Sequence, residues 1–269
     1  MNCRKIAIFV FQGFLMMNYH LSSIQSAFND ADSLNNSSEL YLESLMVDLR
    51  LKNLFLIDET WKSIDMKQND TKGFPGNYSL NPEEIYRALK FTCYQDSLKI
   101  LEFGAGEGTA QLTMLLKKKN VSYDYHVFEN AVQFVKELDN VTYYLYDLPN
   151  NVHCNQWGSA VENIELPILP IFDLIIVDGP HGVSRAKWYC KFKKYTRPGT
   201  VILIDDFHHY KEFEEALEKN FKYITIVEYN QTPTWKLINE GLYPLNPPAG
   251  NKTFKIVIVE EVLPDDFNL

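Results

Sequence analysis

Short apolar segments alternate with helix-forming segments from residue 98 onward, and this alternation limits the fold more than any other feature of the chain. The sequence between the apolar segments predicts helices near 109–118, 130–138, 184–195 and 208–220. The apolar segments themselves are 98–103, 123–128, 141–146, 172–177 and 200–204. Strands that are apolar throughout are typical of a parallel sheet covered by helices on both faces. The sequence therefore predicts an α/β three-layer sandwich.

Two more apolar segments, about 222–229 and 253–260, end this series without a helix between them. Because residues 230–252 are Pro-rich, we expect the two strands to form an antiparallel hairpin at one edge of the sheet. Ahead of the first strand, Asn81 and Pro82 precede two acidic residues. Asn81 suits an N-cap and Pro82 the first helical position, so a helix is predicted to begin here.

The 269 residues are expected to form one main domain, over 80–269, with a helical or linker extension over 27–79. Leucine and methionine recur at helical spacing within 38–64, which predicts a helix in the extension. Residues 1–26 contain an apolar run from 6 to 17. At about 12 residues this run is short for a membrane span, and it suits a signal or anchor segment or a buried first helix.

Asn-x-Ser/Thr sequons, which mark surface acceptors for glycans in secreted proteins, occur eight times. They begin at Asn35, Asn36, Asn69, Asn77, Asn120, Asn140, Asn230 and Asn251. With the apolar run they favour a glycoprotein of the secretory pathway, whereas an Asn-rich composition produces such matches by chance. The sequence leaves the secretory pathway and the cytoplasm about even.

The formal net charge of −9 argues against nucleic acid as a partner, because nucleic-acid binders normally present a basic face. The basic cluster from Lys187 to Lys194 lies on a predicted helix and is interpreted as a solvated face. The four cysteines form no CxxC pair and are interpreted as small buried apolar residues. We expect a small-molecule or sugar acceptor, with a homo-oligomer left open. Membrane attachment is expected only if residues 1–26 remain as an anchor.

A glycine-rich turn follows the first predicted strand and opens the next helix. It reads Leu101-Glu102-Phe103-Gly104-Ala105-Gly106-Glu107-Gly108-Thr109. Glycines at such a turn let the backbone bend tightly and approach a nucleotide, although the pattern alone also suits NAD-binding domains. Glu102 is expected to face a cationic or amino group of the ligand.

Acidic residues end the next two strands, at the rim where open α/β sheets bind ligands. Glu129, which precedes Asn130, is expected to accept the hydroxyl groups of a ribose, and Asp147 the amine of an adenine. Each acid by itself is equally well explained as a capping or solvated residue. Their succession at strand ends favours a nucleotide site.

A second group of acids ends the fourth and fifth strands. Asp178 precedes Gly-Pro-His181, and Asp205 and Asp206 precede two histidines. Neighbouring parallel strands lie about 4.8 Å apart, so the three carboxylates are expected to converge and to suit Mg²⁺. His181 is the expected general base for a hydroxyl bound there. The alternative for Asp205 and Asp206 is a helix cap, and Asp173 is interpreted as a turn residue.

These motifs together resemble those of the class I S-adenosylmethionine-dependent methyltransferases, over roughly residues 80–260. The matching sequences are LEFGAGEGT, FEN, FDLIIVDGPH and RPGTVILIDD. The resemblance implies a Rossmann-like sandwich whose seven-stranded sheet has the order 3-2-1-4-5-7-6, with strand 7 antiparallel. It also implies cofactor binding by Gly104, Ala105, Gly106, Gly108, Thr109, Glu102, Glu129, Asn130, Asp147 and Asp178.

The arrangement of Asp178, His181, Asp205 and Asp206 is similar to that of metal-dependent, macrocin-type sugar O-methyltransferases. It implies Mg²⁺-assisted O-methylation, with Asp178 and His181 as catalytic residues. Asp178-Gly-Pro also resembles the xylan-type sugar-acid methyltransferases of the secretory pathway. Two alternatives remain: an aminopropyltransferase-like enzyme on the same fold, and a catalytically inactive protein that binds the cofactor.

Overall fold

The computed structural model describes residues 52–53, 80, 82–150, 153, 156–229 and 254–265. Seven strands in these residues form one sheet, in the order β5-β4-β3-β6-β7-β9-β8. Their bounds are β3 Leu98–Phe103, β4 Tyr123–Glu129, β5 Val141–Leu145, β6 Leu174–Val177, β7 Val201–Asp205, β8 Phe221–Tyr229 and β9 Phe254–Val262. Counted along the chain from β3, the order is 3-2-1-4-5-7-6, as the sequence predicted.

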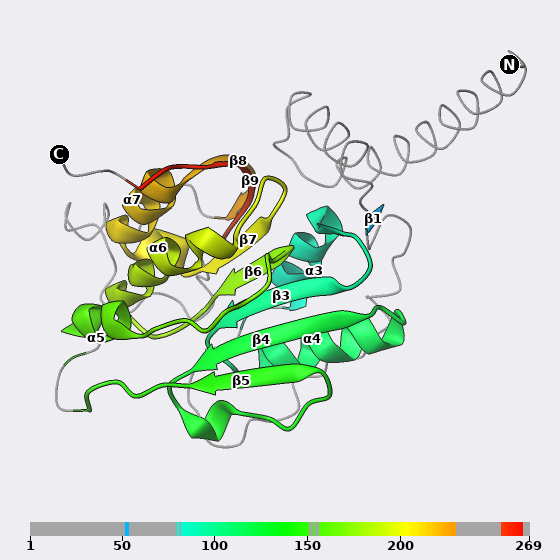
Figure 1. Ribbon diagram of the computed structural model, residues 1–269, viewed down its shortest axis with the longest axis horizontal. Helices are drawn as coiled ribbons and strands as arrows, with labels where there is room; N and C mark the ends of the chain where they lie inside the picture. The colour runs from blue at the N-terminus through cyan, green and yellow to red at the C-terminus, as the bar shows by residue number, and fades with distance from the viewer. Residues whose placement is uncertain are drawn as a thin grey trace, which may run out of the picture.

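The first five strands of this sheet run in one direction. β3 pairs in parallel with both β4 and β6, and the pairs β4–β5 and β6–β7 are parallel as well. β9 is antiparallel to both of its neighbours, β7 and β8. The predicted antiparallel pair at the sheet edge is confirmed. The carboxyl ends of β3 to β6 therefore share one edge, on the left in Figure 1.

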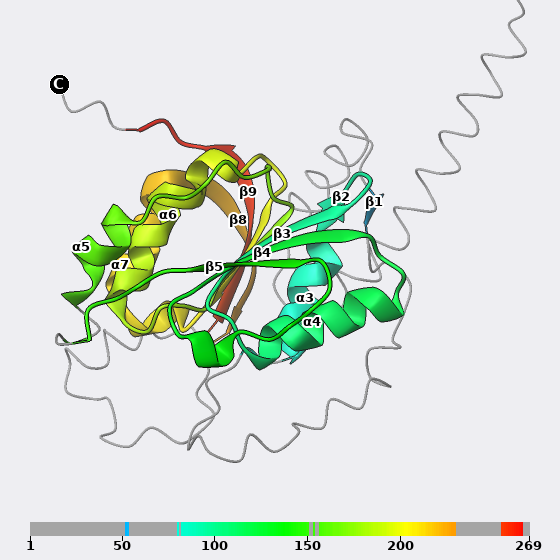
Figure 2. The ribbon, with the colours of Figure 1, turned by 60° about the horizontal axis from the view of Figure 1, so that its bottom comes forward.

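Helices cover both faces of the sheet, and Figure 2 shows α3 and α4 on one face and α5, α6 and α7 on the other. Alternate side chains of each strand enter two separate apolar cores, because successive strand residues point to opposite faces. In β3, Ile100 packs into the core beneath α3 and α4, whereas Leu101 and Phe103 pack into the other. Phe103 stacks on Trp188 of α6, with ring centroids 4.4 Å apart. The three-layer prediction is confirmed.

The helix predicted to begin at Pro82 is confirmed, and the helix predicted near 109–118 begins two residues earlier, at Glu107. The helices are α3 Pro82–Phe91, α4 Glu107–Lys118, α5 Gly158–Asn163, α6 Trp188–Phe192 and α7 Lys211–Asn220. α5 was missed by the sequence pattern. The helix predicted over 184–195 is divided, with 3-10 turns at Val183–Lys187 and Lys193–Tyr195 on either side of α6. The helix predicted over 208–220 begins as a 3-10 turn, Phe207–His209, before α7.

The helix predicted over 130–138 is wrong. Only a 3-10 turn forms there, at Val132–Phe134, and Val135 already has extended backbone, with φ −72 and ψ 126. Val132 is 69% exposed, so a helix at this place would have no apolar surface to cover. Short helices depend on such packing for their stability, which explains why the local propensity does not prevail.

The extension over 27–79 lies outside the described residues except for β1, Lys52–Asn53. β1 pairs antiparallel with β2, Cys93–Tyr94. The helix predicted over 38–64 therefore does not continue through Lys52 and Asn53. The segment 1–26 also lies outside the described residues. Among the residues that are described, no helix has the length and apolarity needed to cross a membrane.

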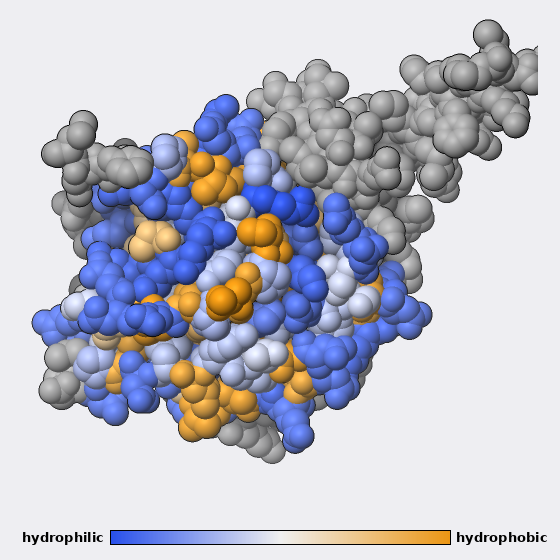
Figure 3. All heavy atoms as spheres, in the orientation of Figure 1, coloured by the Kyte–Doolittle hydropathy of each residue, from blue (hydrophilic) through white to orange (hydrophobic). Residues whose placement is uncertain are grey.

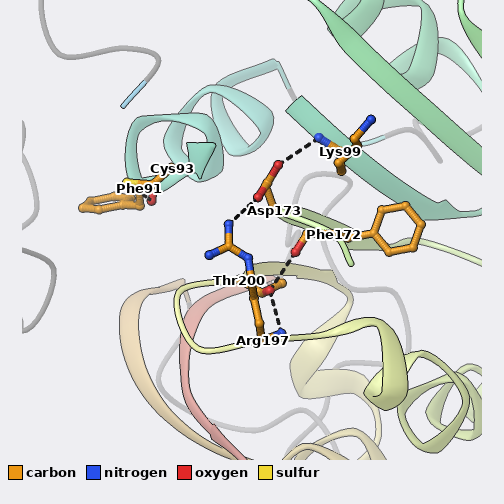
Figure 4. Close-up of polar contacts among 7 residues, drawn as sticks. All are labelled: Phe91, Cys93, Lys99, Phe172, Asp173, Arg197 and Thr200. Carbon is orange, nitrogen blue, oxygen red and sulfur yellow. Dashed lines mark hydrogen bonds and ion pairs between the residues drawn. The ribbon is translucent and has the colours of Figure 1, made fainter. Parts of the chain in front are cut away.

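Asp173 ties three strands together at the amino-terminal edge of the sheet (Figure 4). One carboxylate oxygen accepts the backbone N–H of Lys99 at 3.0 Å, and the other accepts a guanidinium N–H of Arg197 at 2.7 Å. Beside it, the Thr200 hydroxyl donates to the carbonyl oxygen of Phe172 at 2.7 Å. Asp173 lies in a bend just before β6, in agreement with the turn residue that the sequence indicated, and its buried carboxylate is also a structural link.

The exposure of side chains tests two further predictions. Cys93 is buried as predicted, but Cys190 is exposed, so its interpretation as a buried residue is wrong. Lys193 is 8% exposed and pairs with Asp265 at 2.8 Å, so the basic cluster is not a uniformly solvated face. On the face shown in Figure 3, polar side chains predominate and apolar ones form scattered groups.

Asn120 and Asn140 are the two sequon positions within the described residues. Both are exposed and lie in left-handed turns, with φ of 53 and 58, just before β4 and β5. They therefore lie at the amino-terminal edge of the sheet, opposite the edge that carries Glu129 and Asp178. The other six sequons lie outside the described residues.

Candidate active site

The glycine-rich turn leaves β3 at the carboxyl edge of the sheet. Gly104 has a φ of 98, a left-handed conformation that favours glycine. Its backbone N–H donates to the carbonyl oxygen of Phe128 at 2.8 Å, which fixes the turn against β4. A Cβ on Gly104 would lie 2.7 Å from the backbone nitrogen of Gly179, in the loop after β6. Two loops distant in sequence are thus in direct backbone contact.

Gly106 is different, because none of the residues that the structure describes requires a glycine there. Its φ of 164 is extended backbone that any residue adopts, and a Cβ would meet no atom within 4 Å. The space beside Gly106 is open at the N-terminus of the 12-residue helix α4, where backbone N–H groups favour an anion or a polar ligand. This open position fits a nucleotide-type cofactor that approaches the backbone closely.

Glu102, in β3, is connected to this turn by hydrogen bonds through Thr109. The Thr109 hydroxyl donates to its carboxylate at 2.8 Å and accepts the backbone N–H of Gly106 at 3.1 Å. The Tyr125 hydroxyl also donates to Glu102, at 2.5 Å. Burial raises the pKa of Glu102 to about 7, although both hydroxyl groups oppose this rise. Glu102 is 1% exposed, so its contacts lie within the protein and it positions the turn through Thr109.

Glu129, at the end of β4, lies beside the same turn. One carboxylate oxygen accepts the backbone N–H of Ala105 at 2.6 Å, and the other accepts that of Ala131 at 2.6 Å. Burial raises the pKa of Glu129, while N–H bonds from Ala105, Ala131 and Asn130 lower it. These three N–H bonds leave one lone pair of the two carboxylate oxygens, so Glu129 can still accept a hydrogen bond from a ribose hydroxyl. Glu129 therefore lies beside the glycine turn, and its role toward a ribose stays a prediction.

The other residues of the first group surround this turn. Gly108 packs against Leu80, the residue described just ahead of α3. A Cβ on Gly108 would lie 3.4 Å from the Cβ of Leu80. Asp147 is exposed just beyond β5, one residue after Tyr146, whose backbone N–H donates to the carbonyl oxygen of Glu129 at 3.1 Å. Its backbone is near the turn, and its side chain remains available to a ligand.

The second group of acids lies at the carboxyl ends of β6 and β7, and Asp178 immediately precedes Gly179, which contacts Gly104. The backbone N–H of Asp178 donates to the carbonyl oxygen of Phe103 at 2.9 Å, which holds the end of β6 against β3. The side chains of Asp178 and Asp205 lie close enough to interact electrostatically. Burial and the negative charge of Asp205 raise the pKa of Asp178 well above its usual value. The predicted convergence of these two carboxylates is therefore found.

Asp206 adopts left-handed backbone, with φ 55 and ψ 25, and its carboxylate belongs to an ion-pair cluster. Oδ1 lies 3.2 Å from Nδ1 of His209, and Oδ2 lies 3.7 Å from Nη1 of Arg185. Burial raises the pKa of Asp206, but His209 and Arg185 outweigh it and keep that pKa below its usual value. The hydrogen bond with Asp206 in turn raises the pKa of His209.

His181 is exposed in the loop after the cis peptide bond between Gly179 and Pro180. Partial burial of its ring and the charge of Arg185 lower its pKa. A lowered pKa keeps the imidazole neutral near pH 7, as a general base requires. The sequence prediction of His181 on the same rim as Asp178 agrees with this geometry.

The three carboxylates do not form the predicted Mg²⁺ site. Within the described parts of the chain, no group of three or more His, Cys, Asp or Glu side chains is arranged to hold a metal ion. Asp178 and Asp205 lie near each other, while Asp206 pairs with His209 and Arg185. The arrangement of these donors therefore does not fit a three-carboxylate metal centre.

Three important residues were missed by sequence reasoning: Gly179, Arg185 and Tyr125. Gly179 belongs to the quoted Asp-Gly-Pro sequence, but only its contact with Gly104 shows why a side chain is excluded. Arg185 precedes the basic cluster and lies on a predicted helix, where nothing distinguishes it from a surface arginine. Tyr125 has the pattern of an ordinary strand residue, and only strand register places its hydroxyl on Glu102.

Comparison with known proteins gives distant structural likenesses. No family model and no curated protein matches the sequence. The plantazolicin methyltransferase BpumL in complex with SAH has a TM-score of 0.40 at 13% identity, covering 91% of this chain and 100% of that one. An rRNA methylase from Streptococcus thermophilus gives 0.38 at 12%, covering 66% and 93%. Human methyltransferase-like protein 13 in complex with SAH gives 0.36 at 12%, covering 63% and 74%. At these values the likenesses carry no argument about activity, and the fold rests on the strand order.

Proposed function

We propose that the chain is an S-adenosylmethionine-dependent methyltransferase that methylates a hydroxyl group of a small molecule or sugar. The contact between Gly104 and Gly179 is the observation that carries this proposal. It joins the turn beside Glu129 to the loop that carries Asp178 and His181. A cofactor site and a candidate proton-transfer group therefore share one edge of a sheet with the methyltransferase strand order.

The cofactor would be held by the turn at Ala105 and Gly106, by Glu129 and by Asp147. Gly106 lets the ligand approach the backbone, Glu129 accepts the ribose hydroxyl groups, and Asp147 accepts the adenine amine. When bound, S-adenosylmethionine supplies an electrophilic methyl group on a sulfonium. Asp178 lies at the boundary between this cofactor site and the site of the acceptor.

His181 removes the proton of the acceptor hydroxyl in this proposal. Its lowered pKa leaves the ring neutral near pH 7, and its exposed position gives an acceptor access. Asp206 and Arg185 are charged groups that act on its ring. The Mg²⁺ that the sequence predicted is left out of the reaction, because the donor arrangement does not fit a metal centre.

Calorimetry and methyl transfer test this proposal separately. S-adenosylmethionine and S-adenosylhomocysteine should bind the full chain with micromolar affinity, whereas failure of both to bind would contradict the cofactor assignment. Catechols, glycosides and uronic acids are then screened with a radiolabelled methyl donor, with and without EDTA. Decarboxylated S-adenosylmethionine is offered in a parallel assay. Transfer of its aminopropyl group, without any methyl transfer in the screen, would favour the alternative enzyme on this fold.

The role of His181 is tested with the acceptor that this screen identifies. His181→Asn should lower kcat about a hundredfold or more, because general-base catalysis contributes at least that much. Its affinity for S-adenosylhomocysteine should match that of the wild type. Lys187→Gln, an exposed change in the same segment, is the matched control. An unchanged kcat in His181→Asn would show that another group accepts the proton.

A further inference from the structure

Arg185 lies among the carboxylates that the sequence assigned to Mg²⁺, and its side chain is 4% exposed. We propose that the Arg185 guanidinium is the permanent cation of this site: it positions the loops after β6 and β7 and takes the charge-balancing place of a divalent ion. This inference rests on the proposed function only in taking this edge of the sheet as the active site. The arrangement of charges around Arg185 does not depend on that function.

Two hydrogen bonds of Arg185 connect the two loops. Nε donates to the carbonyl oxygen of Pro180 at 3.1 Å, and Nη1 donates to that of Asp205 at 3.0 Å. Because the guanidinium is planar and rigid, two bonds from one group fix the separation of the two backbones. The group lies 5.7 Å from the ring centroid of Phe213 in α7, which supports it from within the core. Arg185 is thus a positioning residue for Asp178, His181 and Asp205.

The charge of Arg185 acts on the acids that a metal would need. Nη1 lies 3.7 Å from Oδ2 of Asp206, and the guanidinium also acts electrostatically on Asp178 and His181. Inside a protein, where screening by water is weak, a divalent ion placed between the same acids would be repelled by this fixed charge. The guanidinium cannot relieve the repulsion by losing its proton.

The carboxylates also have other partners. Oδ1 of Asp206 lies 3.2 Å from Nδ1 of His209, and its Oδ2 lies 3.7 Å from Nη1 of Arg185. A metal ion would have to break these contacts before three oxygens could face one point. The fixed positive charge of Arg185 and the separate partners of the carboxylates lead to the same conclusion. This chain differs from the metal-dependent enzymes whose motifs it resembles.

Binding of Mn²⁺, measured by electron paramagnetic resonance on the full chain, tests this inference without any need for turnover. The wild type should show no stoichiometric site up to about 1 mM Mn²⁺, a range in which carboxylate sites for divalent ions fill. Arg185→Gln removes the charge and should bind Mn²⁺ at least about tenfold more tightly than the wild type. Arg185→Lys keeps the charge and should exclude Mn²⁺ as the wild type does. Lys187→Gln is the control for loss of a nearby positive charge.

Two results would overturn the inference. One is a stoichiometric Mn²⁺ site in the wild type that Asp205→Asn abolishes. The other is a folded Arg185→Gln protein that binds Mn²⁺ no better than the wild type. If Arg185→Gln fails to fold, the wild type and Arg185→Lys still decide whether the site takes a metal. A protein that excludes Mn²⁺ but methylates none of the acceptors would contradict the proposed function and leave this inference standing.

Discussion

Gly104 and Gly179 lie backbone against backbone at the carboxyl edge of the sheet. A Cβ on Gly104 would lie 2.7 Å from the nitrogen of Gly179, and a Cβ on Gly179 would lie 2.7 Å from the Cα of Gly104. Real Cβ atoms do not approach so closely, so each glycine requires the other. The contact brings the turn after β3 and the loop after β6 together, and it places the candidate cofactor and acceptor sites side by side.

The two glycines of the turn should respond oppositely to alanine. Gly104→Ala should lower the free energy of unfolding by about 2 kcal/mol or more, because a left-handed residue gains a Cβ against Gly179. Gly106→Ala should leave stability within about 1 kcal/mol of the wild type and weaken cofactor binding at least about tenfold. Chemical denaturation and calorimetry measure the two effects. Full cofactor affinity in a folded Gly106→Ala protein would show that the ligand does not use this space.

Glu129→Gln should weaken cofactor binding about 10- to 100-fold, since hydrogen bonds to charged groups contribute roughly 1.5–3 kcal/mol. Glutamine keeps one accepting oxygen, whereas the carboxylate accepts backbone N–H groups from both Ala105 and Ala131. Glu137→Gln makes the same chemical change at an exposed position of the neighbouring segment and should leave affinity unaltered. Equal affinities of the two variants, measured by calorimetry, would contradict a role for Glu129.

Glu102 should make the ligand-free protein less stable as pH rises from about 4.5 to 7. Its pKa is about 7 in the folded protein against an ordinary value of 4.5, so the folded state holds a proton that the unfolded state has lost. The stabilisation is complete below the unfolded pKa and lost as pH passes the folded pKa, a change of about 3 kcal/mol. Glu102→Gln should flatten this part of the curve of unfolding free energy against pH, with Glu137→Gln as control. If the curve of Glu102→Gln is as steep as that of the wild type, the group that titrates in this range is not Glu102.

Asp173→Asn should destabilise the protein by about 1–3 kcal/mol, because one of the buried partners of Asp173 loses its acceptor. Those partners are the backbone N–H of Lys99 and the guanidinium of Arg197. Cofactor affinity should stay unchanged, since Asp173 lies at the edge opposite the site. Asp124→Asn, which removes a partly exposed partner of the Lys99 side chain, should cost less than about 1 kcal/mol. Loss of affinity without loss of stability would contradict the structural role.

The sequence alone determined the sandwich and the antiparallel pair at its edge, and the family resemblance supplied the full strand order. Apolar periodicity and turn residues are local properties, and the rules that connect parallel strands leave few topologies open. The same local reasoning placed Glu129 beside the glycine turn and Asp178 beside Asp205, because the carboxyl ends of parallel strands share one edge.

Only the tertiary structure decided what each side chain faces. Glu102 meets Tyr125 because β3 and β4 pair in a register that brings the hydroxyl to the carboxylate, and no local pattern encodes that register. Arg185 lies among the acids at this edge because the loop after β6 and the end of β7 both direct carbonyl oxygens toward its guanidinium. Interactions between distant residues depend on how the layers pack, and local spacing carries no record of that packing.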